Sequence, residues 1–152
     1  MEDRTVELRI PARTELIALT RLVVSTLALT RRELDEERVD DLKLAVSEAV
    51  TNAIESYGTD VEGKAVTVFW TEQSDKLEVR IQDVGKGFDL SRLAAHPPVT
   101  DSARLQFERG LGIPLIRSLV DEALFEPSED GTSVCLSMYC GSLSYTGDPA
   151  AL

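Results

Sequence analysis

Residues 45–54, AVSEAVTNAI, decide the fold, because their apolar side chains recur with the 3.6-residue period of an amphipathic helix. Asp35 is placed to cap this helix, and Gly58 predicts its end. Glu48 and Asn52 lie four residues apart, so they share one side of the helix. That side lies next to the apolar stripe. From this position both side chains can reach into a cleft beside a sheet.

Around this helix, the sequence predicts an α+β chain. Alternation of apolar and polar residues predicts a strand over residues 5–10, and helical periodicity predicts a helix over residues 14–29. Two hairpins are predicted downstream, with a helix between them. Their ranges are 65–71 and 76–82 for the first hairpin, 110–119 for the helix, and 123–126 and 132–139 for the second hairpin.

This order of elements favours a two-layer α/β sandwich, in which helices cover one face of a mixed sheet. Residues 1–140 are expected to form a single domain, and residues 141–152 a flexible tail with little to bury. Residues 89–108 show weak periodicity. A loop of that length is typical of a lid or of a disordered segment.

The composition excludes several classes of protein. Apolar residues make up 43% of the 152, which argues against a disordered chain, and no apolar run approaches the roughly 20 residues that span a bilayer. A net charge of −11 disfavours direct nucleic-acid binding and favours a partner with a basic patch. Cys135 and Cys140 have a poor spacing for a disulfide within one strand. We expect reduced thiols in a cytoplasmic protein.

Asp83, Gly85 and Gly87 follow the strand predicted over residues 76–82. An aspartate at a strand end can accept a hydrogen bond from an exocyclic amine, such as that of adenine. The glycines permit positive φ and close approach of the backbone to a ligand. In isolation, the motif is more often a plain glycine-rich turn.

A second glycine motif, RGLG at residues 109–112, leads directly into the last predicted helix. The free N–H groups and the dipole at a helix N-terminus favour phosphate, and the arginine could add a charge-assisted contact. Taken alone, the motif is equally a helix entered through a glycine turn. Gly131 and Thr132 precede the last strand, where turn chemistry alone is a sufficient explanation.

The order of these motifs is more specific than any one of them. Glu48 and Asn52 alone are ordinary polar residues of an amphipathic helix, although an amide oxygen suits Mg²⁺ and a carboxylate can accept a proton. With both glycine motifs downstream, the chain resembles the histidine-kinase-like ATPase superfamily (Bergerat fold) of gyrase, the heat-shock chaperone and the histidine kinases. Residues 45–54 closely match the serine-kinase anti-sigma factors of bacterial stress and sporulation control. The resemblance covers roughly residues 5 to 140.

The resemblance implies a role for each site residue. Glu48 would be the catalytic base that activates the substrate serine, and Asn52 would bind Mg²⁺. Asp83 would contact the adenine amine, and Thr132 would support that contact. The remaining contacts to ATP would come from the two glycine motifs, that is from Gly85, Gly87, Arg109, Gly110, Leu111 and Gly112.

The resemblance also implies partners. A protein of this family binds and inhibits an alternative RNA polymerase sigma factor as a homodimer. It uses ATP and Mg²⁺ to phosphorylate a serine of a STAS-domain anti-sigma-factor antagonist. No direct contact with nucleic acid or with a membrane is expected. The apolar face of the strand over residues 5–10 could pair across a two-fold axis.

One departure from the family pattern keeps a second function open. The family commonly has a histidine four residues after the asparagine, where this chain has Ser56. The alternative is a nucleotide-binding anti-sigma or partner-switch module with little or no kinase activity. A histidine-kinase catalytic domain is a third hypothesis, and it ranks last because the single histidine of the chain lies in the proline-containing loop.

Overall fold

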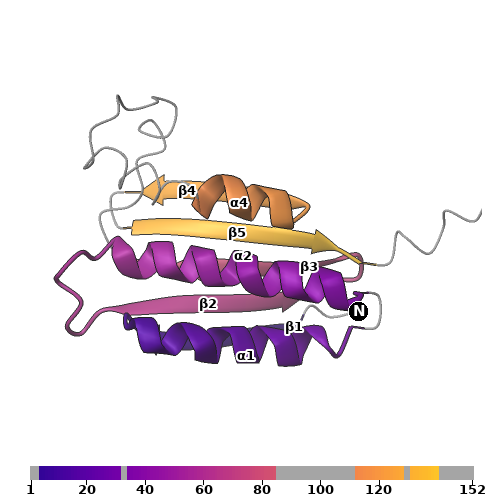
Figure 1. The fold of residues 1–152 in the computed structure, drawn as a ribbon, viewed down its shortest axis with the longest axis horizontal. Coiled ribbons are helices and arrows are strands. Elements are labelled where there is room, and N and C mark those ends of the chain that lie inside the picture. Colours follow the sequence, from indigo (N-terminus) through magenta and orange to yellow (C-terminus); the bar gives the residue numbers. More distant parts are fainter. Residues whose placement is uncertain (1–3, 32–33, 85–111, 129–130, 141–152) are drawn as a thin grey trace, which may run out of the picture.

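The computed structural model describes residues 4–31, 34–84, 112–128 and 131–140, which form a five-stranded sheet with helices packed against it (Figure 1). In chain order the elements are β1 (Arg4–Pro11), the 3₁₀ turn η1 (Thr14–Leu16), α1 (Ile17–Ala28), α2 (Glu36–Glu55), β2 (Ala65–Glu72), β3 (Lys76–Gln82), α4 (Gly112–Leu119), β4 (Glu122–Ser128) and β5 (Gly131–Tyr139). The predicted loop over residues 89–108 and the predicted tail over residues 141–152 lie outside the described residues.

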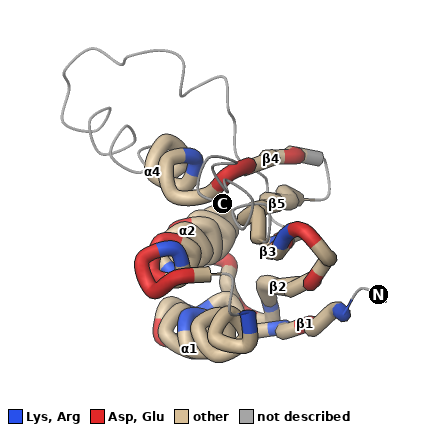
Figure 2. The backbone as a smooth tube through the Cα atoms, turned by 90° about the vertical axis from the view of Figure 1, so that its right-hand side faces the viewer, with Lys and Arg blue, Asp and Glu red and all other residues tan. Residues whose placement is uncertain are grey.

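The helices and the strands form two layers. Figure 2 shows α1, α2 and α4 side by side in one layer and the strands in the other. The second face of the sheet carries no described helix. Polar side chains such as those of Glu7 and Arg80 lie on this face, and along each strand they alternate with residues that point toward the helices. The predicted two-layer α/β sandwich is therefore confirmed.

The sheet itself differs from the prediction of a mixed sheet. Its strand order is β1-β2-β3-β5-β4, and every described pair is antiparallel. Between β1 and β2 the chain runs back over one face of the sheet in α1 and forward again in α2. The start of β2 therefore pairs with the end of β1 (Ala65 with Pro11). β3 and β4 run in the same direction, but β5 lies between them. No parallel neighbours result among these strands.

The predicted long helix is confirmed as α2, which lies at the centre of the helical layer. Val46 and Val50 are fully buried against the sheet, where they join a core that includes Val66 and Val79. Burial of one such side chain stabilises the fold by about 1.5–3 kcal/mol relative to its exposed state. Asp35 caps α2, since its side chain accepts a hydrogen bond from the Arg38 N–H at 2.8 Å.

Both cysteines are free thiols. Cys135 is half-buried on β5, and Cys140 is buried just after that strand. Burial, together with the neighbouring Glu78 carboxylate, raises the pKa of the Cys135 thiol to about 11, so it stays protonated at neutral pH. None of the described helices combines the length and the apolar character that crossing a bilayer requires.

Candidate functional site

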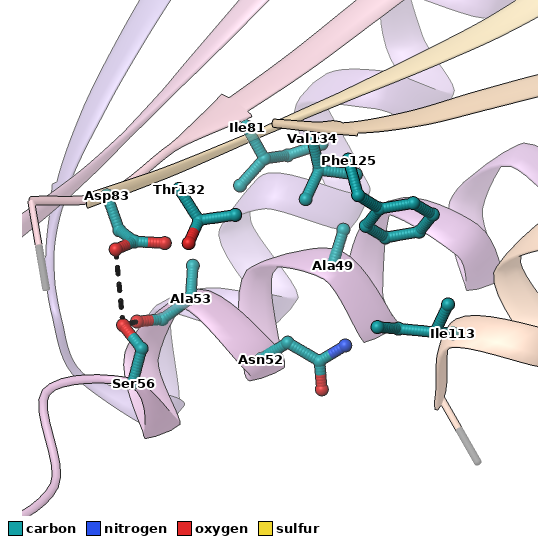
Figure 3. A pocket seen from close by; sticks show the side chains of 10 residues that line it. All are labelled: Ala49, Asn52, Ala53, Ser56, Ile81, Asp83, Ile113, Phe125, Thr132 and Val134. Atoms are coloured by element: carbon teal, nitrogen blue, oxygen red, sulfur yellow. Dashed lines mark hydrogen bonds between the residues drawn. The ribbon is translucent and has the colours of Figure 1, made fainter. Parts of the chain in front are cut away.

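A pocket lies between the second half of α2 and the sheet, at the end where β3 finishes and β5 begins (Figure 3). Most of its wall is apolar, with polar groups from α2 and from the strand ends. The lining residues are Ala49, Asn52, Ala53 and Ser56 on α2, Ile81 on β3 and Asp83 after it, Ile113 on α4, Phe125 on β4, and Thr132 and Val134 on β5. An apolar pocket with a few convergent polar groups is the usual form of a small-molecule site.

The Asp83 carboxylate is a polar group that lines one end of the pocket. The residue is only 5% exposed, and Ser56 Oγ donates a hydrogen bond to Asp83 Oδ1 at 3.2 Å (Figure 3). The Asp83 N–H donates to the Thr132 carbonyl at 3.0 Å, which holds the end of β3 against β5. Buried polar atoms are strongly oriented by such bonds, because leaving them unpaired is costly. Asp83 therefore presents a fixed hydrogen-bond acceptor to the pocket.

The backbone next to Asp83 is held on two sides. The Val84 N–H donates to Tyr57 Oη at 3.0 Å, and Tyr57 Oη donates to the Ala65 carbonyl at 2.6 Å. On the other side, Gly131 has φ +143°, and a Cβ added there would lie 1.9 Å from the Asp83 carbonyl oxygen. Only glycine permits this approach of β5 to the end of β3.

Glu48 and Asn52 meet the first described residue of α4 at the other end of the site. A Cβ added to Gly112 would lie 3.2 Å from Glu48 Oε2 and 3.3 Å from Asn52 Nδ2. The glycine therefore lets the start of α4 approach both side chains closely. The N-terminus of α4 also carries the positive end of the helix dipole, which favours an anion beside this pair.

The structure thus brings together five of the residues predicted for the site. Asp83 and Thr132 lie at one end, and Glu48, Asn52 and Gly112 lie at the other. The other predicted contacts, Gly85, Gly87, Arg109, Gly110 and Leu111, lie outside the described residues.

Tyr57 and the packing role of Gly131 in this site are not predicted by the sequence patterns. Tyr57 is 8% exposed, and a buried tyrosine needs a hydrogen-bond partner, which is the signal that could have drawn attention to it. The sequence pattern around Gly131 predicts only a turn, because the contact of this residue is with Asp83, 48 positions earlier in the sequence. The apolar walls Ile81 and Phe125 gave no signal beyond ordinary strand patterning.

The fold and the pocket define a class of protein, the ATPases with a histidine kinase-like domain, and the profile of the histidine kinase-like ATPase domain matches residues 10–138. The sequence is 37% identical to the serine-protein kinase RsbW of Listeria monocytogenes over 142 residues, which cover 91% of this chain and 88% of that protein. The RsbW of Staphylococcus epidermidis is 33% identical over 138 residues, or 88% and 86% of the two chains. This chain belongs to the serine-protein kinase RsbW family.

A solved structure has a similar fold. The structure of the RsbU and RsbW domains of a Mycobacterium tuberculosis protein matches with a TM-score of 0.57 and 22% sequence identity. The match covers 89% of this chain and 32% of that longer chain, so this chain spans about a third of the length of the solved one.

Proposed function

We propose that this protein binds ATP in the pocket beside α2 and is both a protein serine kinase and an anti-sigma factor. In this function it inhibits an alternative RNA polymerase sigma factor and phosphorylates a serine of a STAS-domain antagonist. One observation carries the proposal. A single site places a buried acceptor, Asp83, at one end, and a carboxylate and an amide, Glu48 and Asn52, at the other, facing the start of α4.

The adenine end of the site is the end with Asp83. Its carboxylate accepts a hydrogen bond from the exocyclic amine of adenine, and Thr132 supports this contact. The apolar side chains of Ile81 and Val134 pack against the faces of the base. This arrangement leaves the phosphates directed along α2 toward Asn52, Glu48 and the start of α4. The glycine motifs, including Gly85, Gly87 and the segment 109–111, are proposed to complete the contacts.

Mg²⁺ is proposed to bind at Asn52, whose amide oxygen is a suitable hard ligand. No cluster of three or more histidine, cysteine, aspartate or glutamate side chains suited to a metal occurs in the described part of the chain. The donor set fits an ion that takes most of its ligands from phosphate oxygens and water, as Mg²⁺ does in nucleotide sites. When bound, the ion would neutralise phosphate charge.

Glu48 is proposed as the base for phosphoryl transfer. Its carboxylate accepts the proton of the substrate serine hydroxyl as the serine oxygen attacks the γ-phosphorus, and ADP leaves with the electrons of the broken P–O bond. Glu48 lies beside Gly112, at the end of the site proposed to hold the phosphates, which supports this role.

A nucleotide-binding module without kinase activity remains the second candidate function. The observation behind it is Ser56, where the family commonly has histidine. In the structure, Ser56 contacts Asp83 at the adenine end. Ser56 is eight residues from Glu48, about 12 Å along the helix axis. A serine at this position therefore affects the contacts to adenine more directly than phosphoryl transfer at Glu48. This favours the kinase over the module without kinase activity.

The partners follow from the same proposal. A sigma factor and a STAS-domain antagonist would bind in the cytoplasm, and the net charge of −11 favours surfaces with basic patches on those partners. A homodimer is proposed through the edge of the sandwich formed by β1 and α1. In its support, β1 pairs only with β2 among the described strands, and α1 exposes Leu19 and Leu22.

Phosphate transfer from labelled ATP tests the proposal, with Mg²⁺ and antagonist proteins encoded near this gene as acceptors. Glu48→Gln is expected to reduce transfer by about 10²–10⁴-fold and to leave ATP affinity within about twofold, because it removes the base and keeps the size of the side chain. Glu55→Gln is the matched control, since Glu55 is exposed on the same helix, and it should transfer phosphate like the wild type.

Each other outcome has a definite meaning. Unchanged transfer by Glu48→Gln would contradict the role of Glu48. A wild-type protein that binds ATP and the antagonist but transfers no phosphate would support the second candidate function. A protein that binds no ATP would overturn both.

A further inference from the structure

The end of α2 holds the segment after β3 at two adjacent points. Ser56 Oγ donates to Asp83 Oδ1 at 3.2 Å, and the following residue, Tyr57, accepts a hydrogen bond from the Val84 N–H at 3.0 Å. Tyr57 is itself held by its bond to the Ala65 carbonyl at 2.6 Å. The carboxylate of Asp83 and the amide next to it are therefore both positioned by the same helix end.

The Ser56 hydroxyl is also anchored to its own helix. Its oxygen lies 2.7 Å from the Ala53 carbonyl, one turn earlier, and a hydroxyl has a single hydrogen that the two acceptors share. Ser56 is half-buried and lines the pocket directly. The hydroxyl thus has a fixed place between α2 and Asp83, and it occupies one side of the Oδ1 atom (Figure 3).

The orientation of the Asp83 carboxylate determines which purine it can accept. A 6-amino purine offers an N–H donor to the carboxylate, whereas a 6-oxo purine places a carbonyl oxygen there, so that two acceptors face each other. A site that hydrogen-bonds one group of a ligand strongly disfavours a ligand that lacks this group, because the buried polar group of the protein is then left unpaired. That discrimination is weakened if the carboxylate is free to turn.

We propose that Ser56 is a positioning residue that sets the preference of this site for 6-amino over 6-oxo purine nucleotides by holding the Asp83 carboxylate. This inference rests on the proposed contact of Asp83 with adenine. It assigns a role to the position at which this chain departs from the family pattern. The Tyr57 bond acts on the backbone beside Asp83, whereas the Ser56 bond acts on the carboxylate itself.

The test is the ratio of the dissociation constants of inosine triphosphate and ATP, measured by calorimetric titration of the full chain. Ser56→Ala is expected to lower this ratio by about three- to tenfold, the effect of one hydrogen bond. Ser56→Thr keeps the hydroxyl and should restore the ratio to within about twofold of the wild type. Thr26→Ala is the matched control, because it removes a hydroxyl that bonds the Leu22 carbonyl on α1 at 2.8 Å.

A merely structural role for Ser56 would weaken both nucleotides equally and leave the ratio unchanged, which would overturn the proposal. Asp83→Asn separates this failure from failure of the proposed function. If Asp83→Asn abolishes the preference for ATP while Ser56→Ala keeps it, only the role of Ser56 is wrong. If the wild type shows no preference, or if Asp83→Asn does not change it, the adenine contact itself is wrong.

Discussion

Gly131 shows at the scale of one residue how the site depends on close backbone approach. Its φ of +143° is disfavoured for any residue with a side chain, and the position of a Cβ would be 2.7 Å from Val84 Cα as well as in collision with the Asp83 carbonyl. Both contacts are with main-chain atoms, which cannot rotate away. The strain would therefore be transmitted to Asp83.

Gly131→Ala is expected to lower the free energy of unfolding by about 3 kcal/mol or more, or to displace the segment at Asp83 and weaken ATP binding at least tenfold. Urea denaturation and ATP titration measure the two effects. Gly63→Ala is the matched control, because Gly63 also has a positive φ of +72° but nothing within 4 Å of an added Cβ. It should cost about 1–2 kcal/mol and leave ATP affinity unchanged. Equal effects of the two substitutions on both measurements would contradict the argument.

At the same scale, the sequence predicted the polar residues of the site better than their neighbours. Glu48 and Asn52 were placed on one side of a helix by their spacing, and the structure has them there, both beside Gly112. Their contact with α4 was not predictable from spacing, because the residues are about 60 positions apart in the chain. The bond from Ser56 to Asp83 likewise joins α2 to the end of β3.

At the scale of the element, α2 begins at a definite residue because Asp35 caps it. The Asp35 backbone is extended, and the side chain satisfies one of the free N–H groups of the first turn, that of Arg38. Glu36 and Glu37 follow in that turn, where negative charge is favoured by the helix dipole. The start of α2 therefore depends on local chemistry, whereas its packing depends on the sheet.

Asp35→Ala is expected to reduce the free energy of unfolding by about 1 kcal/mol, within the usual range for loss of a cap. Chemical denaturation checks this value. Asp40→Ala provides the control, because Asp40 is a surface residue of the same helix whose side chain is 68% exposed and lies 3.5 Å from Lys43. A bridge of that kind contributes little, so the change should stay within about 0.5 kcal/mol. A cost for Asp35→Ala no larger than for Asp40→Ala would show that the cap is not needed.

At the scale of the whole molecule, the two edges of the sheet differ. β1 forms one edge and β4 the other. Apolar side chains are exposed on β1 and on α1 beside it: Val6 is 42% and Leu22 is 63% exposed. On the far edge, Leu124 of β4 is 56% exposed. If the edge formed by β1 and α1 is the dimer interface, a charged residue introduced there should weaken the dimer, and one introduced on β4 should not.

Leu22→Glu is expected to weaken the proposed homodimer at least tenfold, because the two-fold axis brings the new charge into the interface twice. Light scattering after size-exclusion chromatography over a range of concentrations measures the dissociation. Leu124→Glu, at the opposite edge, should leave the dimer intact. A wild-type monomer at micromolar concentration would contradict the dimer, and an effect of Leu124→Glu alone would place the interface at the other edge.

The sequence by itself determined the elements and their layer arrangement, since apolar periodicity, caps and turn residues act over a few neighbouring positions. It determined that Asp83 stands at the end of a strand and that Glu48 and Asn52 share one side of α2. Tertiary structure alone decided that the sheet is antiparallel, because β5 is inserted between β3 and β4. It also decided that Gly112, Gly131 and Ser56 each contact a residue from another part of the chain. Such contacts depend on how separate elements pack, and no local pattern in the sequence encodes them.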